Sequence, residues 1–101
     1  MSNKTDAIID ERVEIDVEMP RLWTVVFLND DVTPMELVID ILLSVFKMEK
    51  EQAKKKTLEI HNFGAAAMGP YPFEIAEERA LQSTKIARKF GSPLRVTIEE
   101  Q

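Results

Sequence analysis

The chain has 101 residues without cysteine, 45% of them apolar and 31% charged. This composition favours one globular domain with a modest core and excludes disulfides and thiolate chemistry. The net charge is −5, so we expect no general attraction for nucleic acid. The N-terminus has no apolar signal region and no run reaches ~18 apolar residues, so we expect no membrane span and a cytoplasmic location.

Residues 1–20 form the first unit, with six acidic against two basic side chains and no aromatic residue. This composition, ending at Met19-Pro20, predicts a flexible acidic arm. The alternating stretch "VEIDVE" leaves a short edge strand inside the arm as an alternative. Residues 21–101 are expected to be the folded domain.

The domain begins with a predicted strand, about Leu22 to Leu28, which is β-branched and aromatic and too short for a helix. Three polar acceptors follow it: Asn29, Asp30 and Asp31. Taken alone, such a cluster indicates a polar turn with Asx hydrogen bonds that leads into a helix.

Several local rules place the start of the first helix at Thr33. Thr33 suits the N-cap, Pro34 suits the first helical position, and Glu36 completes a capping box. Val32 and Leu37 have the spacing of a hydrophobic staple. The helix that follows carries so many apolar residues that we expect it to be nearly all buried, or to meet a ligand on one side; they include Met35, Val38, Ile41, Leu42, Val45 and Phe46.

The second predicted helix runs from about Glu49 to Asn62. Gly64 has the position of a left-handed residue that ends it. The spacing of three and four residues puts one set of side chains near a common face: Ala53, Thr57, Ile60 and His61. A histidine at this place is also explained simply by the negative end of the helix dipole.

The remaining elements are a strand, a helix and a strand. "AAAMG" is expected to be a short central strand, and "PYP" a rigid lead into a third helix from about Phe73 to Phe90, ended by Gly91 and Pro93. "LRVTIE" alternates and predicts the last strand. The inward face of the third helix should carry Ala76, Ala80, Ser83, Ala87 and Phe90.

The element order is therefore β-α-α-β-α-β. It predicts an α+β fold in which a small three-stranded antiparallel sheet packs on three helices.

Catalytic patterns are missing from the sequence. There is no nucleophile elbow, zinc pair or phosphate-binding glycine loop, and there is one histidine. Asp30 and Asp31 lack the alternating ligands and central glycine of a calcium loop. We therefore expect no enzyme, no metal and no cofactor. The residues alone lead to a small binding domain and no further.

Four segments in collinear order extend this interpretation: "LNDDVTPMELV", "LEIHNFGAAAMG", "EIAEERA" and "GSPLRVTIE". Together, over about residues 22–99, they resemble the ClpS family of bacterial adaptor proteins. The resemblance implies a fold like the C-terminal domain of the ribosomal stalk protein. It also implies a monomeric adaptor that binds free N-termini with a first residue of Leu, Phe, Tyr or Trp, and that delivers them to the ClpA-type unfoldase of the ClpAP protease.

The resemblance also implies a peptide-binding site. Asn29, Asp30 and His61 match the family positions that hold the α-ammonium group of the bound peptide. An ammonium group offers only hydrogen-bond donors, so it requires acceptors such as these. The apolar pocket beside them would be lined by Asp31 at its edge and by Thr33, Met35, Val38, Thr57, Ile60 and Leu94. An ordinary core role stays open for Met35, Val38 and Ile60.

Three residues depart from the family pattern. Thr57 stands where Met is usual, Pro72 replaces the usual Thr cap, and Ser92 stands where His is common; the first bears on selectivity. Glu74 and Arg79 match positions that dock on the N-terminal domain of the unfoldase, although ordinary surface charge also explains them. The arm would be the family's delivery segment.

Two other functions stay open from the sequence. One is a stalk-like interaction domain that binds no N-degron, which has no reason to carry Asn29 and Asp30 together with His61. The other is a metal-dependent hydrolase, which a metal titration would separate from an adaptor.

Overall fold

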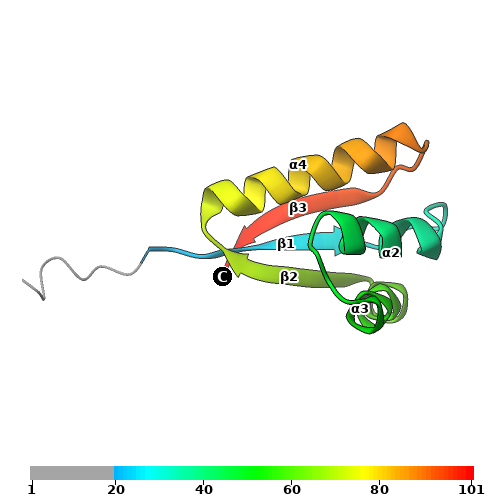
Figure 1. The fold of residues 1–101 in the computed structure, drawn as a ribbon, viewed down its shortest axis with the longest axis horizontal. Coiled ribbons are helices and arrows are strands. Elements are labelled where there is room, and N and C mark those ends of the chain that lie inside the picture. The colour runs from blue at the N-terminus through cyan, green and yellow to red at the C-terminus, as the bar shows by residue number, and fades with distance from the viewer. Residues whose placement is uncertain (1–19) are drawn as a thin grey trace, which may run out of the picture.

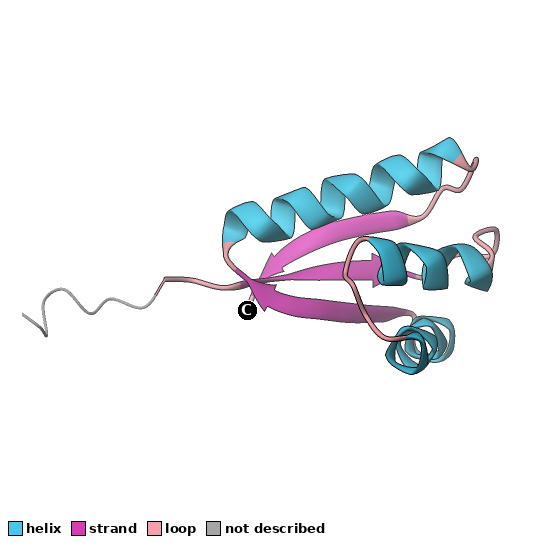
Figure 2. Cartoon of the chain, viewed as in Figure 1, coloured by secondary structure: helices cyan, strands magenta, loops and turns pink. Residues whose placement is uncertain are grey.

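The computed structural model describes residues 20–101, so the predicted arm and the strand considered within it lie outside the described residues, apart from Pro20. The elements, shown in Figure 2, are β1 (Trp23–Leu28), α2 (Met35–Ser44), α3 (Lys50–Phe63), β2 (Ala65–Tyr71), α4 (Phe73–Lys89) and β3 (Arg95–Glu100). This order and the antiparallel three-stranded sheet confirm the predicted α+β fold.

The sheet has the order β2-β1-β3, and both neighbours pair with β1 in antiparallel register. The prediction that the alanine-rich strand is central was wrong, because β1 takes that place. β2 buries only one face: Ala66 and Met68 are buried, whereas Ala67 between them is exposed. β2 also extends through Pro70, and a proline suits an edge strand because it lacks the N–H of a ladder.

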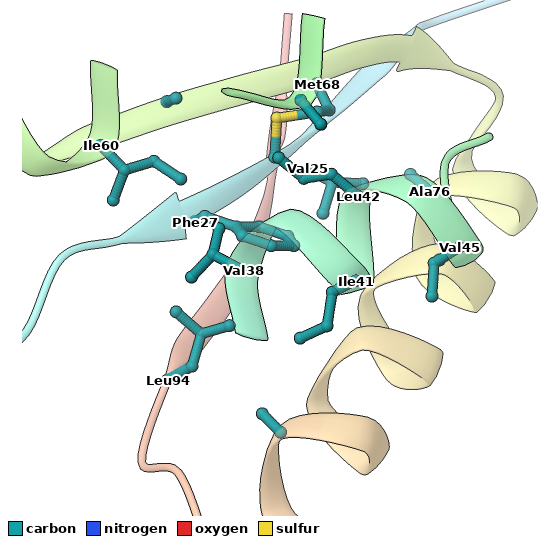
Figure 3. Packing of buried hydrophobic residues seen from close by; sticks show 13 residues of the cluster. Val25, Phe27, Val38, Ile41, Leu42, Val45, Ile60, Met68, Ala76 and Leu94 are labelled. Carbon is teal, nitrogen blue, oxygen red and sulfur yellow. The ribbon is translucent and has the colours of Figure 1, made fainter. Parts of the chain in front are cut away.

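The helices define where the core lies. In Figure 1, α4 runs along the sheet beside β3, while α2 and α3 lie at the end of the sheet where β1 ends. Val25 and Phe27 of β1 are fully buried, and Figure 3 shows Phe27 pointing toward Val38 and Leu42 of α2. Burying an aromatic or aliphatic side chain of this kind contributes ~1.5–3 kcal/mol. These side chains of β1 and α2 therefore belong to one hydrophobic core.

The start of α2 differs from its prediction. The N-cap is Pro34, in an extended conformation with ψ of 144°, and no side chain of the described residues caps the helix. Val32 is 66% exposed, so the expected hydrophobic staple is also wrong. The Thr33 hydroxyl donates instead to the carboxylate of Asp30, at 2.8 Å. The side chain of Thr33 therefore stabilises the loop before the helix and does not cap the helix.

The ends of α3 and α4 follow the prediction. Gly64 ends α3 with φ of 90°, in the left-handed region that favours glycine. Gly91, with φ of 77°, ends α4 in a Schellman arrangement: its N–H bonds the Arg88 carbonyl, and the Ser92 N–H bonds the Ala87 carbonyl. Phe90 is 68% exposed, so its predicted inward position is wrong. Over residues 20–101, every helix is too short or too polar to cross a bilayer.

Candidate functional site

A cavity of about 260 Å³ opens where β1 ends, between the β1–α2 loop, α2 and α3. Every residue that the resemblance assigned to the peptide site lines it, so the structure brings all of them together. Leu28 was missed, although as the last residue of β1 it directly precedes the polar cluster. The lining residues are Leu28, Asn29, Asp30, Asp31, Thr33, Met35, Val38, Thr57, Ile60, His61 and Leu94.

One backbone hydrogen bond brings the polar residues of the cavity together. The Asn29 N–H donates to the Gly64 carbonyl at 2.9 Å, directly beyond the Leu28–Ala65 pair of the β1–β2 ladder. Because Gly64 ends α3, this bond places Asn29 beside the last turn of that helix, which carries His61. Both side chains are exposed, and within residues 20–101 neither has a hydrogen-bond partner. Their acceptor atoms are therefore available to a ligand.

The carboxylate of Asp30 is held by its own loop. Its Oδ1 accepts the N–H groups of Val32 and Thr33, both at 2.7 Å, and its Oδ2 accepts the Thr33 hydroxyl at 2.8 Å. Burial raises the pKa of Asp30, but these three bonds outweigh it, so the pKa lies below its usual value. The turn expected from the sequence is therefore present. A carboxylate has about four acceptor positions, so within residues 20–101 one position on Oδ2 has no partner.

The wall of the cavity is apolar. Val38, Ile60 and Leu94 are all at least 95% buried, so they belong to the core and line the cavity at once. Met35 is 38% exposed. The Thr57 hydroxyl donates to the Ala53 carbonyl at 2.8 Å, so its proton is used within α3. These wall side chains therefore offer a ligand an apolar contact surface and no free hydrogen-bond donor.

A larger groove of about 880 Å³ lies between α2 and α4. Apolar side chains line it, Phe90 among them, and its charged residues are Glu36, Asp40 and Lys89. The larger groove is therefore lined by groups of both charges. The small cavity differs from the larger groove in that its polar lining, within residues 20–101, includes Asn29, Asp30 and His61 and contains no lysine or arginine. No group of three or more His, Cys, Asp or Glu residues able to hold a metal ion occurs in the described part of the chain.

Glu74 and Arg79 lie away from the cavity. Both are on α4, whose first turn lies at the opposite end of the sheet from α3 in Figure 1. Glu74 is exposed, and Arg79 Nη1 lies 3.5 Å from the carboxylate of its neighbour Glu78. Burial raises the pKa of Tyr71, and the charge of Arg79 partly offsets this, so Arg79 lies near that ring. The two predicted surfaces are thus separate in space.

The family model described as "ATP-dependent Clp protease adaptor protein ClpS" matches residues 18–97. The chain belongs to this family. Among curated members, the ClpS adapter protein of Nautilia profundicola is 46% identical over 90 residues, covering 87% of this chain and 93% of the relative. That of Shewanella pealeana is 40% identical over 92 residues, covering 91% of this chain and 90% of the relative.

A solved structure gives the same family. It is Agrobacterium tumefaciens ClpS2 bound to L-phenylalaninamide, which is similar to this chain with a TM-score of 0.80 and 35% identity. The match covers 82% of this chain and 100% of that chain. The resemblance read from four short segments is therefore confirmed at the level of sequence and of fold.

Proposed function

We propose that this chain is a non-enzymatic adaptor that captures proteins through a free N-terminus with a large apolar first residue and hands them to the Clp protease. One observation carries the proposal: acceptor positions that no group within residues 20–101 occupies lie together on one apolar cavity. They are the side chains of Asn29 and His61 and the free Oδ2 position of Asp30.

The polar part of this site suits an α-ammonium group. Such a group has three N–H donors and no acceptor, and the site offers an amide oxygen, a carboxylate and an imidazole nitrogen. Hydrogen bonds to charged groups of this kind contribute ~1.5–3 kcal/mol each. Because Asp30 is already fixed by three bonds, it loses little freedom when the ligand arrives.

The apolar part suits one side chain. The cavity of about 260 Å³ lies below the roughly 300–1,000 Å³ of pockets that enclose drug-sized ligands. Burying one Leu or Phe side chain there contributes ~1.5–3 kcal/mol. The related ClpS2 structure holds L-phenylalaninamide, a ligand with a free amino group beside a large apolar side chain. We expect Leu, Phe, Tyr and Trp to be accepted as first residues.

The deciding experiment compares one Phe-starting peptide with a free and with an acetylated N-terminus, by calorimetry or fluorescence anisotropy. Acetylation removes the charge and adds bulk where the acceptors meet. Losing one such bond at ~3 kcal/mol already weakens binding on the order of a hundredfold.

Protein variants test the same site. Asp30→Ala should lower the affinity for the free peptide as severely as acetylation does, and His61→Ala should bind that peptide clearly more weakly than the native chain. Asp40→Ala, an acidic residue of the other groove, is the control that should change nothing. Equal binding of both peptide forms would remove the basis of the proposal.

The proposal includes an unfoldase partner. The N-terminal domain of a ClpA-type unfoldase would dock on the α4 face that carries Glu74 and Arg79, and the acidic arm of residues 1–20 would deliver the substrate. The adaptor would act as a cytoplasmic monomer. We expect Glu74→Lys to weaken unfoldase binding while peptide affinity stays unchanged.

Deletion of residues 1–17 should leave peptide affinity intact and block degradation. A tenfold loss of peptide affinity would show that the arm belongs to the peptide site.

A further inference from the structure

The Asp30 carboxylate is the end of a chain of hydrogen bonds that passes through Ser92, a residue outside the cavity lining. The Leu94 N–H donates to the Ser92 hydroxyl at 3.1 Å, and that hydroxyl lies 2.6 Å from the Thr33 hydroxyl. Thr33 in turn donates to Asp30 Oδ2 at 2.8 Å. Ser92 is only 4% exposed, does not line the cavity, and comes 59 residues after Thr33.

Counting protons fixes the direction of this chain. Each hydroxyl has one proton to donate. Asp30 is ionised at neutral pH, since its pKa is lowered, so it only accepts, and the Thr33 proton is spent on it. The contact between the two hydroxyls must then be a donation from Ser92 to Thr33. All the donors point toward the carboxylate, and hydrogen bonds in such a chain polarise one another.

Ser92 is itself fixed on every polar atom. Its N–H donates to the Ala87 carbonyl at 2.8 Å as part of the turn that ends α4. Its carbonyl accepts Arg88 Nη1 at 2.8 Å, and the same nitrogen donates to the Leu94 carbonyl at 2.9 Å. These bonds fix the backbone of Ser92, and the Leu94 N–H that donates to the hydroxyl holds the side chain toward Thr33.

We infer that Ser92 is a positioning residue of the amino-group site: acting through Thr33, its hydroxyl holds the Asp30 carboxylate so that one Oδ2 position stays free for an α-ammonium group. This inference rests on the proposed function, because that function makes Asp30 an acceptor. Without the Ser92 donor, the Thr33 hydroxyl is free to rotate toward water. Asp30 then loses the side-chain bond on Oδ2 and keeps only the two N–H bonds on Oδ1, so the position of Oδ2 is less well fixed.

The test uses three variants. Two of them interrupt the chain of hydrogen bonds and are called the two cuts, and the third keeps the chain intact. Ser92→Ala removes the outer donor, Thr33→Val removes the middle hydroxyl at constant shape, and Thr33→Ser keeps it. Affinity is measured for a Phe-starting peptide with a free N-terminus. The titration of the Asp30 carboxyl is followed by NMR in the peptide-free full chain, and circular dichroism checks the fold.

We expect both cuts to weaken binding roughly five- to tenfold, as for loss of one hydrogen bond. Both should also raise the pKa of Asp30. Thr33→Ser should keep the peptide affinity and the Asp30 pKa of the native chain. The other ionisable side chains near the site are unchanged in all variants, so the titration reports on the hydroxyls; they are Asp31 and His61 on the cavity and Arg88 at the end of α4.

A purely structural role gives a different pattern. Ser92→Ala also frees the Leu94 N–H, and Leu94 lines the cavity. In an Asp30→Asn background, the inferred role predicts that Ser92→Ala changes peptide affinity less than about twofold, because coupled residues are not additive. A loss that persists in that background overturns the inference, as does an Asp30 titration that neither cut moves.

The two proposals fail in distinguishable ways. If both cuts leave affinity and titration unchanged while acetylation still abolishes binding, only the role of Ser92 is wrong. If Asp30→Asn binds the peptide as tightly as the native chain does, the ammonium site itself is misplaced and the inference falls with it. If Ser92→Ala does not fold, Thr33→Val decides alone, because it leaves the Ser92–Leu94 bond in place.

Discussion

Replacing Thr57 by methionine should make the site discriminate more strongly against peptides that begin with Ile or Val. Thr57 is 3% exposed, lines the cavity, and lies one turn before His61 on α3. Its hydroxyl is bound to the Ala53 carbonyl, so toward a ligand it acts as a short wall. Methionine reaches further from the helix and would occupy part of a cavity of about 260 Å³.

The size of the effect follows from where the competing side chains branch. Ile and Val branch at the β-carbon, directly beside the amino group that the acceptors fix, whereas Leu and Phe branch further along. A longer wall near the mouth therefore clashes with one methyl group of Ile and leaves Leu free. One methyl-sized mismatch is worth ~1–3 kcal/mol, or roughly ten- to two-hundredfold in relative affinity.

The assay is the ratio of affinities for Leu- and Ile-starting peptides that are otherwise identical. Thr57→Val is the matched control, since it keeps the shape and removes only the bond to Ala53; its ratio should equal that of the native chain. The ratio should rise in Thr57→Met. An unchanged ratio in Thr57→Met would mean that position 57 does not control the width of the pocket, and the exposed Met35 would be the residue to test next.

Four further predictions concern stability and pH. Ser83 is fully buried and its hydroxyl has no partner within residues 20–101, so Ser83→Ala should raise the free energy of unfolding by about 1 kcal/mol in urea titrations; a decrease would reveal an unrecognised partner. At Gly64 a Cβ would meet no atom of residues 20–101 within 4 Å, so Gly64→Ala should cost only the left-handed backbone strain of about 1–2 kcal/mol, measured in the same way; a larger loss would contradict this. The lowered pKa of Asp30 adds stability above its ordinary value of 3.8 that is lost as pH falls through the lowered value, so acid unfolding of Asp30→Asn should lack part of this decline. Peptide affinity should fall as pH rises above roughly 8, where a free α-amino group loses its proton, and a flat alkaline profile would contradict a charged ligand.

The parts of the fold that local rules determine were predictable from the sequence. Glycine at the ends of α3 and α4 is one case, since Gly64 and Gly91 have the left-handed φ that other residues avoid. The alternation that predicts β3 is another, because a strand with one buried face needs a period of two. The residues of the cavity were predictable only through the resemblance, since three separate segments supply them.

The features that failed depend on contacts distant in sequence. Thr33 has every local mark of a cap, but its hydroxyl is hydrogen-bonded to Asp30 and to Ser92. Ser92 lies 59 residues away, so no local sequence pattern around the helix includes it. Phe90 continues the apolar spacing of α4 but falls after its last turn, where the chain already leaves the core. The place of β2 at the edge depends on which strand pairs with two others, which local patterns do not encode.

The bond from Asn29 to Gly64 has a consequence for how the protein behaves under stress. It joins two stretches of chain that have no reason to meet unless β1, α3 and β2 are all formed, so a partly unfolded molecule has no pocket at all. Apparent affinity then equals intrinsic affinity multiplied by the folded fraction. Heat or damage that unfolds the domain therefore also releases the bound substrate, and an unfolded adaptor no longer delivers substrates for degradation.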